Sequence, residues 1–448
     1  TDKLLDIARE AKKDGIEMLV MDDGWFGKRN KDDSSLGDWV VNEEKIKGGL
    51  KNLVDKVNEI GLEFGIWFEP EMISPDSDLY REHPEWAIQI PGREATEIRC
   101  QYVLDLSRPE VQDYAYECVA KILRSANIKY VKWDMNRQLS DLGSTYLDKD
   151  SQQELFHRYV LGMYAMQERL IQEFPDLLLE NCSGGGARFD PGMLYYSPQI
   201  WCSDDTDAIE RLEIQEGTAL IYPLCSMGAH VSVCPNHTVG RVTPFTTRGH
   251  VALAGTFGYE LDITKLPEEE RKLIPEQTAM YHKYHELIRE GEYYRILSSR
   301  ENHRSDCWAV ASEDKSEVLV SSNLGASANE NDGASAESIQ MIQSLFMTQS
   351  VDVFFSDYDF FYSLGEFDYF TDIRECFPEE VLEKYKDDIV YVKSTETGKK
   401  YPIGIKLKGN AWVEKTGWYP DTCVVGLAAG LKNKDLAVKF IEENILED

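Results

Sequence analysis

The sequence predicts an α/β protein: a (β/α)8 barrel that lacks its first strand, then the start of an antiparallel β domain, then a separate C-terminal α+β segment. Three observations lead to this prediction. Helical segments alternate with short apolar runs as far as about Glu260, which is typical of a parallel sheet with right-handed crossovers. The runs number about seven, one fewer than a closed barrel has. The chain opens directly in a helix, so the missing strand is most simply the first one.

Each element is predicted from its own periodicity. Leu4, Leu5, Ile7 and Ala8 place apolar residues on one face of an opening helix, which Gly15 ends. The other predicted helices cover residues 50–60, 111–125, 152–174 and 209–220. The predicted strands cover residues 16–21, 64–68, 128–133, 177–179, 200–202, 229–233 and 252–257.

The composition divides the chain into four parts. Residues 1–290 carry the truncated barrel, and residues 291–320 begin an antiparallel domain with short alternating strands. Residues 321–337 are rich in Ser, Ala, Asn and Gly, as linkers are. Residues 338–448 are aromatic and acidic, and they predict a separate α+β segment with a closing helix at 436–446.

The charge of the chain restricts its partners. The 80 acidic and 48 basic residues give a formal net charge of −32. Such a field repels nucleic acid and anionic lipid, and it suits a neutral small-molecule ligand. No apolar stretch is long enough to span a membrane, and the start of the chain lacks the pattern of a signal peptide. We therefore expect no nucleic-acid partner and no membrane insertion.

The cysteines favour a reducing compartment. Nine cysteines form an odd count without a close CxxC pair, so reduced thiols in a cytoplasmic protein fit better than a disulfide scaffold. Cys225, Cys234, His230 and His237 are close in sequence, but their spacing is irregular for a zinc site. We expect no metal and no cofactor.

Two predicted strands end in aspartates, and barrel enzymes keep their reacting groups at such ends. Asp134 follows one strand, near Lys132 and Arg137, cations that favour an ionised nucleophile. The alternative role for Asp134 is a cap on the next helix.

Asp204 follows the other strand and fits the role of a proton donor. Asp205 and Asp207 fit that role almost equally well, so these residues alone leave the choice open. Two carboxylates of this kind are the minimum equipment for cleaving a glycosidic bond.

Other strand ends carry candidate binding groups. Asp22 and Asp23 suit sugar hydroxyls better than calcium, which needs six to eight oxygen ligands. Trp67, Trp133 and Trp201 can form a pocket wall against a sugar ring or can be barrel core.

Two further features lie after predicted strands. Residues 181–186 form a glycine-rich loop without the P-loop or dinucleotide pattern, so close approach of backbone to a ligand is the better interpretation. Glu69 and Glu71 flank Pro70 and either compete for the catalytic role or hold a loop by salt bridges.

Five short motifs follow one another in a specific order. They are DDGWF at 22–26, WFEPEM at 67–72, KWDMNR at 132–137, CSGGG at 182–186 and WCSDDTD at 201–207. In this order they resemble the bacterial α-galactosidases of glycoside hydrolase family 36, over about residues 2–320.

The resemblance implies a retaining double displacement on oligosaccharides such as melibiose and raffinose. It implies Asp134 as nucleophile and Asp204 as general acid/base, which resolves the choice among the three aspartates. The two carboxyl groups of a retaining enzyme are about 5 Å apart. The resemblance further implies that the following residues contact substrate: Asp22, Asp23, Trp67, Arg99, Lys132, Cys182, Gly185 and Trp201.

The chain departs from the family pattern at both ends. The family's N-terminal β-sandwich and first barrel strand are absent, and its C-terminal domain gives way after about Val320. A homo-oligomer is possible, although the family's oligomers use the missing parts. Residues 338–448 weakly resemble the end of an extracellular solute-binding lipoprotein, through residues 351–355, the YPIGI string at 401–405 and the closing helix.

Two other interpretations stay open. The chain can be a non-catalytic carbohydrate-binding or remnant protein in which the site residues persist. It can also be an α-galactosyl transferase or an α-N-acetylgalactosaminidase, a choice that the pocket wall near Cys182 would govern.

Overall fold

The computed structural model describes residues 1–302, 305–324, 353–357, 362, 365, 370–395, 397–408, 423–427, 429, 434–442 and 446. They belong to two compact units. Unit 1 comprises Thr1–Tyr294 and Ala309–Ser321, and unit 2 comprises Arg295–Trp308 and Ser322–Asp448. Within the described ranges, no helix is both long and apolar enough to cross a membrane.

Unit 1 is built on parallel strands that follow one another in chain order. Five of them form one parallel sheet: β1 (Met18–Met21), β2 (Glu63–Phe68), β5 (Tyr130–Trp133), β6 (Leu178–Asn181) and β7 (Gln199–Ile200). A parallel pair follows, β8 (Gly228–Ser232) and β9 (Thr256–Glu260). A parallel bridge from Ile200 to Met227 joins the two sets. Because the strands are parallel, the residues after their carboxyl ends gather along one edge.

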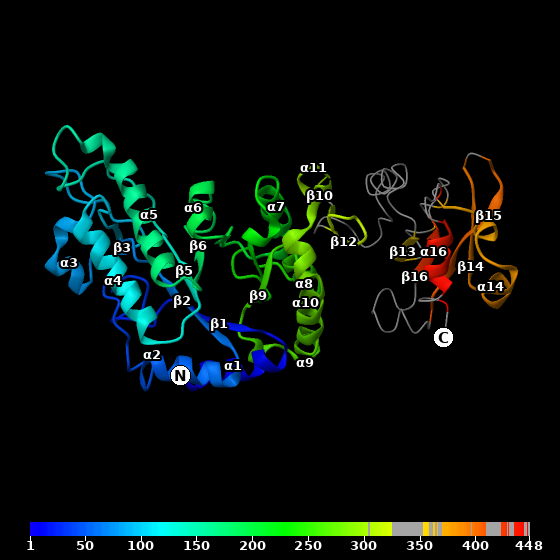
Figure 1. Ribbon diagram of the computed structural model, residues 1–448, viewed down its shortest axis with the longest axis horizontal. Coiled ribbons are helices and arrows are strands. Elements are labelled where there is room, and N and C mark those ends of the chain that lie inside the picture. The colour runs from blue at the N-terminus through cyan, green and yellow to red at the C-terminus, as the bar shows by residue number, and fades with distance from the viewer. Residues whose placement is uncertain are drawn as a thin grey trace. The chain divides into compact units, whose positions relative to one another are not determined.

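Helices connect these strands and cover them. They are α1 (Asp2–Lys13), α2 (Gly49–Ile60), α4 (Pro109–Ser125), α5 (Leu155–Glu173), α6 (Pro191–Tyr196), α7 (Ala208–Ala219), α8 (Phe245–Ala252), α9 (Glu268–Arg271) and α10 (Ile274–Glu290). Helices α2, α4 and α5 lie along the flank of β1, β2 and β5 (Figure 1). Their boundaries follow from local chemistry: Pro109 occupies the first turn of α4, and Gly61, in the left-handed region at φ 96°, ends α2.

The core of unit 1 lies between the sheet and these helices. Phe64, Ile66 and Phe68 of β2 are fully buried, as are Leu53 and Val57 of α2. At about 25 cal/mol per Å² of buried apolar surface, such side chains contribute about 1.5–3 kcal/mol each.

The first helix of unit 1 contacts its last elements (Figure 1). Glu10 of α1 forms an ion pair with Arg271 of α9. The Thr278 hydroxyl of α10 donates to the Asp14 carbonyl at 2.5 Å, and the His282 ring donates to the Gly15 carbonyl at 3.0 Å. The chain therefore returns to its starting point after the seventh parallel strand.

Smaller elements complete unit 1. Between β2 and α4 lie β3 (Met72–Ile73), α3 (Asp78–Glu82), η1 (Pro84–Trp86) and β4 (Tyr102–Val103), with β3 and β4 antiparallel. The single-turn helices are η2 (Gln152–Glu154), η3 (Leu224–Ser226) and η4 (Ile263–Lys265). Residues of both units make up strands β10 (Glu292–Leu297), β11 (Ser305–Ala311) and β12 (Val318–Leu324), which form another sheet in that order. Helix α11 (Ser299–Asn302) precedes β11 and belongs to unit 2.

Unit 2 contains a four-stranded antiparallel sheet with its own apolar core. The sheet order is β13 (Val353–Asp357), β16 (Cys423–Leu427), β15 (Lys400–Lys406) and β14 (Ile389–Lys393). The helices are η5 (Ile373–Glu375), α14 (Glu379–Lys384) and α16 (Lys434–Ile441). Ile373, Phe377, Ile405 and Val425 are buried in this core.

The structure confirms an α/β protein and corrects some predicted elements. The predicted strand at 252–257 is wrong, because 245–252 is helix α8 and the strand β9 begins at Thr256. The predicted start of the linker at residue 321 falls inside β12. Most of residues 321–337 lie outside the described residues. The four-part division, and the likeness of 338–448 to a solute-binding lipoprotein, stay predictions.

Candidate active site

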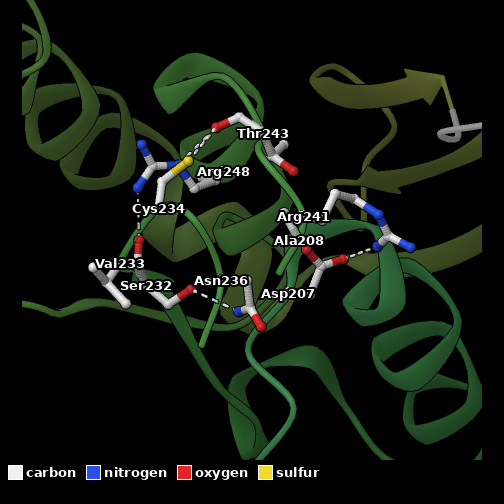
Figure 2. Close-up of a pocket in the computed structure, with 9 residues that line it drawn as sticks. All are labelled: Asp207, Ala208, Ser232, Val233, Cys234, Asn236, Arg241, Thr243 and Arg248. Atoms are coloured by element: carbon white, nitrogen blue, oxygen red, sulfur yellow. Dashed lines mark hydrogen bonds and ion pairs between the residues drawn. The ribbon is translucent and has the colours of Figure 1, made fainter. Parts of the chain in front are cut away.

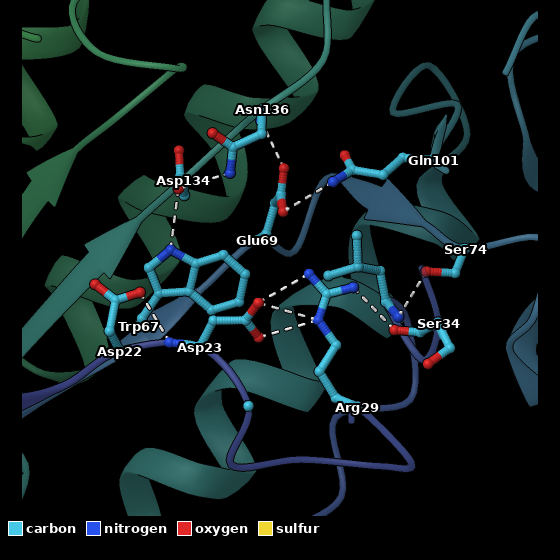
Figure 3. Close-up of polar contacts among 12 residues, drawn as sticks. Asp22, Asp23, Arg29, Ser34, Trp67, Glu69, Ser74, Gln101, Asp134 and Asn136 are labelled. Carbon is cyan, nitrogen blue, oxygen red and sulfur yellow. Dashed lines mark hydrogen bonds and ion pairs between the residues drawn. The ribbon is translucent and has the colours of Figure 1, made fainter. Parts of the chain in front are cut away.

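Asp134 stands immediately after β5 and is held from three sides (Figure 3). Its Oδ1 accepts from the Met135 amide at 2.8 Å. Its Oδ2 accepts from the Trp67 indole at 3.0 Å and from the Asn136 side-chain amide at 2.7 Å. The carboxylate is buried with the rest of the residue. These three donors fix the orientation of the carboxylate.

Lys132 and Asp22 form the next part of the site. The Lys132 ammonium lies 3.0 Å from Asp22 Oδ2 and 5.5 Å from the centre of the Trp201 ring. Burial alone lowers the pKa of Lys132, but the carboxylates of Asp22 and Glu180 outweigh burial and raise it above its usual range. A permanent cation therefore lies beside the Asp22 carboxylate, which is more than half exposed.

Asp23 is oriented by Arg29, a residue that the sequence analysis missed. The buried Arg29 guanidinium reaches both Asp23 oxygens at 2.9–3.1 Å and also donates to the Ser34 carbonyl at 3.0 Å (Figure 3). Asp22 and Asp23 are thus each held by their own cation. This arrangement suits two carboxylates that accept from neighbouring hydroxyl groups of one ligand.

The glycine-rich loop joins Asp134 to the segment that carries Asp204. Burial and the nearby Asp134 carboxylate raise the pKa of the Cys182 thiol, so this thiol stays protonated. At the other end of the loop, the Gly186 amide donates to the Cys202 carbonyl at 3.1 Å. Gly185 has φ +87°, and a Cβ there would lie 2.9 Å from Ser203 Cα. Only glycine permits this approach.

The three aspartates after β7 have different surroundings. Asp207 caps α7 through the amides of Ile209 and Glu210 at 3.0 and 3.1 Å, and it forms an ion pair with Arg241 (Figure 2). Asp205 accepts from the Asp207 amide at 3.0 Å. Asp204 is exposed, and in the part of the chain that the structure describes its carboxylate has no hydrogen bond or ion pair. Of the three, Asp204 alone has both oxygens available.

Figure 2 shows residues that line a small hollow, with Asp207 among them. Its walls carry Asp207, Ser232, Cys234, Asn236, Arg241 and Arg248. The two arginines are already occupied, Arg241 by Asp207 and Glu210, and Arg248 by Glu270 and backbone carbonyls. Because both arginines are engaged within the protein, we assign this hollow no part in the candidate site.

Glu69, directly after β2, is fully buried beside Asp134. Its Oε1 accepts from the Asn136 amide at 2.5 Å, while the Asn136 side chain donates to Asp134 (Figure 3). Burial, followed by the Asp134 charge, raises the pKa of Glu69 to about 8. Glu69 is therefore a neutral acid at neutral pH, and the negative charge of this pair resides on Asp134.

This raised pKa predicts a pH-dependent effect of Glu69→Gln on stability. Between pH 4.5, the ordinary pKa of a glutamate, and about pH 8, Glu69 binds a proton when the chain folds. The contribution of the buried neutral acid to the free energy of unfolding is therefore complete below pH 4.5 and is lost as the pH rises to about 8. The Gln variant should match the parent near pH 4.5 and exceed it by on the order of 3–5 kcal/mol at pH 8.

The measurement is the urea midpoint of both proteins across this pH range. Glu63→Gln, an exposed position on the same strand, is the control and should give no pH-dependent difference. An equal change in stability from Glu69→Gln at pH 4.5 and at pH 8 would show that the pKa of Glu69 is not raised, so that Glu69 is charged at neutral pH in the folded protein.

Glu71 and Arg188 form a second buried network that the sequence did not reveal. The two guanidinium Nη atoms lie 2.8 Å from the two Glu71 oxygens, and Arg188 Nε donates to Ser183 Oγ at 2.7 Å. Trp133 and Tyr159 also donate to Glu71, at 2.7 and 2.5 Å. The pair ties the glycine-rich loop to the end of β2, which is the structural role left open for Glu71.

Some predicted contacts differ from the structure. Trp133 is fully buried against Glu71, so it is core and not pocket wall. Arg137 was expected near Asp134, but its guanidinium donates to the Gln138 and Thr96 carbonyls and to Ser140, because the chain turns away after Asn136. Arg99 lies in an exposed turn, and among the described residues its side chain has no hydrogen bond or ion pair. Its contact with substrate stays a prediction.

The fold and site define a class of protein: an α/β protein with acidic groups at the carboxyl ends of parallel strands. The Melibiase family profile matches residues 1–291 of this chain. The chain belongs to the Melibiase family, and the resemblance to family 36 α-galactosidases is confirmed.

Two curated relatives show the extent of the likeness. The chain is 53% identical to the α-galactosidase AgaA of Geobacillus stearothermophilus over 319 residues, which are 71% of this chain and 44% of AgaA. It is 52% identical to the α-galactosidase Mel36A of Lactobacillus acidophilus over 319 residues, 71% of this chain and 43% of Mel36A. The chain therefore spans less than half the length of these relatives.

Solved structures of AgaA match the fold. One matches with a TM-score of 0.73 at 52% identity, over 75% of this chain and 46% of AgaA. An AgaA variant solved with raffinose matches with a TM-score of 0.71 at 51% identity, over 73% of this chain and 46% of that one.

Proposed function

We propose that this chain is a retaining exo-α-galactosidase that removes terminal α-galactosyl groups from oligosaccharides such as raffinose and melibiose. The observation that carries the proposal is the glycine-rich loop, whose Cys182 end lies beside Asp134 and whose Gly185 packs on the backbone of Ser203 and Asp204. The bound raffinose of the AgaA variant supports the substrate class.

In the proposed first step, an Asp134 oxygen attacks the anomeric carbon while Asp204 gives its proton to the departing glycosidic oxygen. A β-galactosyl ester on Asp134 forms, and the C1–O bond to the aglycone breaks. In the second step, Asp204 takes a proton from water, which attacks the same carbon; the ester bond from C1 to Asp134 breaks, and α-galactose leaves. The neutral Glu69 leaves the charge on Asp134 for this attack.

The remaining residues are proposed to hold the sugar. Asp22 and Asp23, each fixed by a cation, accept from hydroxyl groups distant from the reacting carbon. Trp67 and Trp201, which are also buried, are proposed to line the pocket, and the remaining contacts are proposed for Lys132, Cys182, Gly185 and Arg99. The protonated Cys182 thiol beside Asp134 would face the substituent next to the anomeric carbon.

We further propose that the seven parallel strands are those of a (β/α)8 barrel without its first strand. Their uninterrupted chain order supports this, as do the contacts of α1 with α9 and α10. The nine free thiols favour a cytoplasmic site of action. A small oligosaccharide is the proposed partner, without cofactor or metal, and self-association is possible.

The test is hydrolysis of 4-nitrophenyl α-galactoside by the purified chain, with the first-formed sugar observed by ¹H NMR. We expect turnover, and α-galactose before mutarotation. β-Galactose as the first product would contradict the retaining mechanism. Folded protein without turnover would favour a non-catalytic carbohydrate-binding protein, and preference for an N-acetylated galactoside or an alcohol acceptor would identify one of the related enzymes.

A further inference from the structure

Arg211 of α7 is a buried arginine that binds the segment carrying Asp204. Its Nε donates to the Asp205 carbonyl at 2.6 Å, and its Nη2 donates to the Ser203 carbonyl at 2.6 Å. Its Nη1 donates to the Gly228 carbonyl at 3.1 Å and contacts Cys202 Sγ at 3.2 Å. The two shortest bonds are thus to the peptide carbonyls on either side of Asp204.

The partners of this guanidinium are unusual for a buried charge. Buried charges in proteins are normally paired with an opposite charge. Among the described residues no carboxylate lies within ion-pair distance of Arg211, which is 2% exposed. Its planar group instead lies 4.5 Å from the centre of the Trp201 ring. The guanidinium N–H groups thus bind three backbone carbonyls and the Cys202 sulfur, while the plane of the group lies near one ring of the proposed sugar pocket.

Asp204 needs such an external support. Among the residues that the structure describes, none binds its carboxylate and fixes its direction, whereas Asp134 accepts from three donors. Gly185 also packs closely on the backbone of Ser203 and Asp204. The position from which the Asp204 side chain extends is therefore set by its backbone, and that backbone is held by Arg211.

We propose that Arg211 is the positioning residue of the general acid/base, acting through the backbone of Ser203 and Asp205. This inference rests on the proposed function and adds to it a residue that need not touch substrate. A general acid contributes on the order of 10²–10⁴-fold to a rate, and only when it is within hydrogen-bond reach of the leaving oxygen.

The chain offers a matched control in Arg248, on the neighbouring helix α8. Arg248 is also buried, lies 5.0 Å from the Phe245 ring centre, and donates to the Ser232 and Thr243 carbonyls at 2.6 and 3.1 Å (Figure 2). Its guanidinium also holds a loop, the one between β8 and α8, but that loop carries no proposed catalytic group.

The experiment compares kcat/KM for melibiose, a poor leaving group that needs an acid, with kcat/KM for 4-nitrophenyl α-galactoside, which needs little. Arg211→Lys keeps the positive charge but loses the planar guanidinium that binds the Ser203 and Asp205 carbonyls together. We expect it to lower kcat/KM for melibiose on the order of 10²-fold, and for the aryl substrate by no more than about threefold. Arg248→Lys should change both substrates by the same factor.

A second variant at Arg211 and a double-mutant cycle with Asp204 complete the test. Arg211→Gln should give the same leaving-group dependence, and Arg211→Lys should add little to Asp204→Asn, because both act on one proton transfer. Equal losses on both substrates, additive effects with Asp204→Asn, or failure of both Arg211 variants to fold while Arg248→Lys folds would overturn the inference. A parent protein without turnover would instead overturn the proposed function, and the inference with it.

Discussion

Asp134→Asn is expected to lower kcat/KM for 4-nitrophenyl α-galactoside by about 10⁴-fold or more, because the amide cannot form the galactosyl ester. Its oxygen can still accept from Trp67 and Asn136, so the indole and amide donors of the pocket keep a partner. The measurement is the initial rate at saturating and limiting substrate. A second readout is the mass of the protein after treatment with a slow-reacting fluorinated galactosyl donor. The parent should gain the mass of the galactosyl ester, and the variant should not.

Asp207→Asn is the control for this substitution. It also converts a buried aspartate in the same unit, but asparagine caps a helix as well as aspartate does. The α7 cap through Ile209 and Glu210 should persist, while the ion pair with Arg241 is lost. We expect a lower melting temperature and a kcat/KM within a few-fold of the parent. Residual activity of Asp134→Asn near that of Asp207→Asn would show that another group is the nucleophile.

The sequence predicted the long helices well, because the spacing of apolar residues within each helix shows which face is buried. The helices expected at 50–60 and 111–125 are Gly49–Ile60 and Pro109–Ser125, and a terminal Gly and an initial Pro mark these boundaries. The error at 252–257 has the opposite cause. Its apolar residues are divided between the end of α8 and the start of β9, and so short a run has no period that distinguishes helix from strand.

In the candidate site, too, some residues could be predicted from the sequence and others could not. Asp134 and Lys132 stand at or near the end of a strand with a clear apolar pattern, so their position follows from the sequence. Arg188 could not be found in this way, because its partner Glu71 is 117 residues distant and nothing local distinguishes it from a surface arginine. Arg211 was hidden for a related reason: its partners are backbone carbonyls, which carry no sequence signal.

The Glu71–Arg188 pair should dominate the stability of the site. Among the described residues, Arg188→Ala would leave the fully buried Glu71 carboxylate with only the Trp133 and Tyr159 donors. Removing one partner of a buried ion pair costs about 3–5 kcal/mol. The glycine-rich loop would also lose its bond from Arg188 to Ser183. We therefore expect a loss of about 3–5 kcal/mol in the free energy of unfolding, measured by urea titration with tryptophan fluorescence.

Arg158→Ala is the matched control, because Arg158 binds Glu154 with two bonds of 2.7 and 2.8 Å but on an exposed face of α5. Exposed pairs of this kind contribute about 0–1 kcal/mol, since water solvates both charges when the pair is broken. The double variant Glu71→Gln with Arg188→Ala should be more stable than Arg188→Ala alone, because it removes the unpaired buried charge. If the double variant were less stable than Arg188→Ala, the loss would come from packing of the Arg188 side chain and not from the charge left on Glu71.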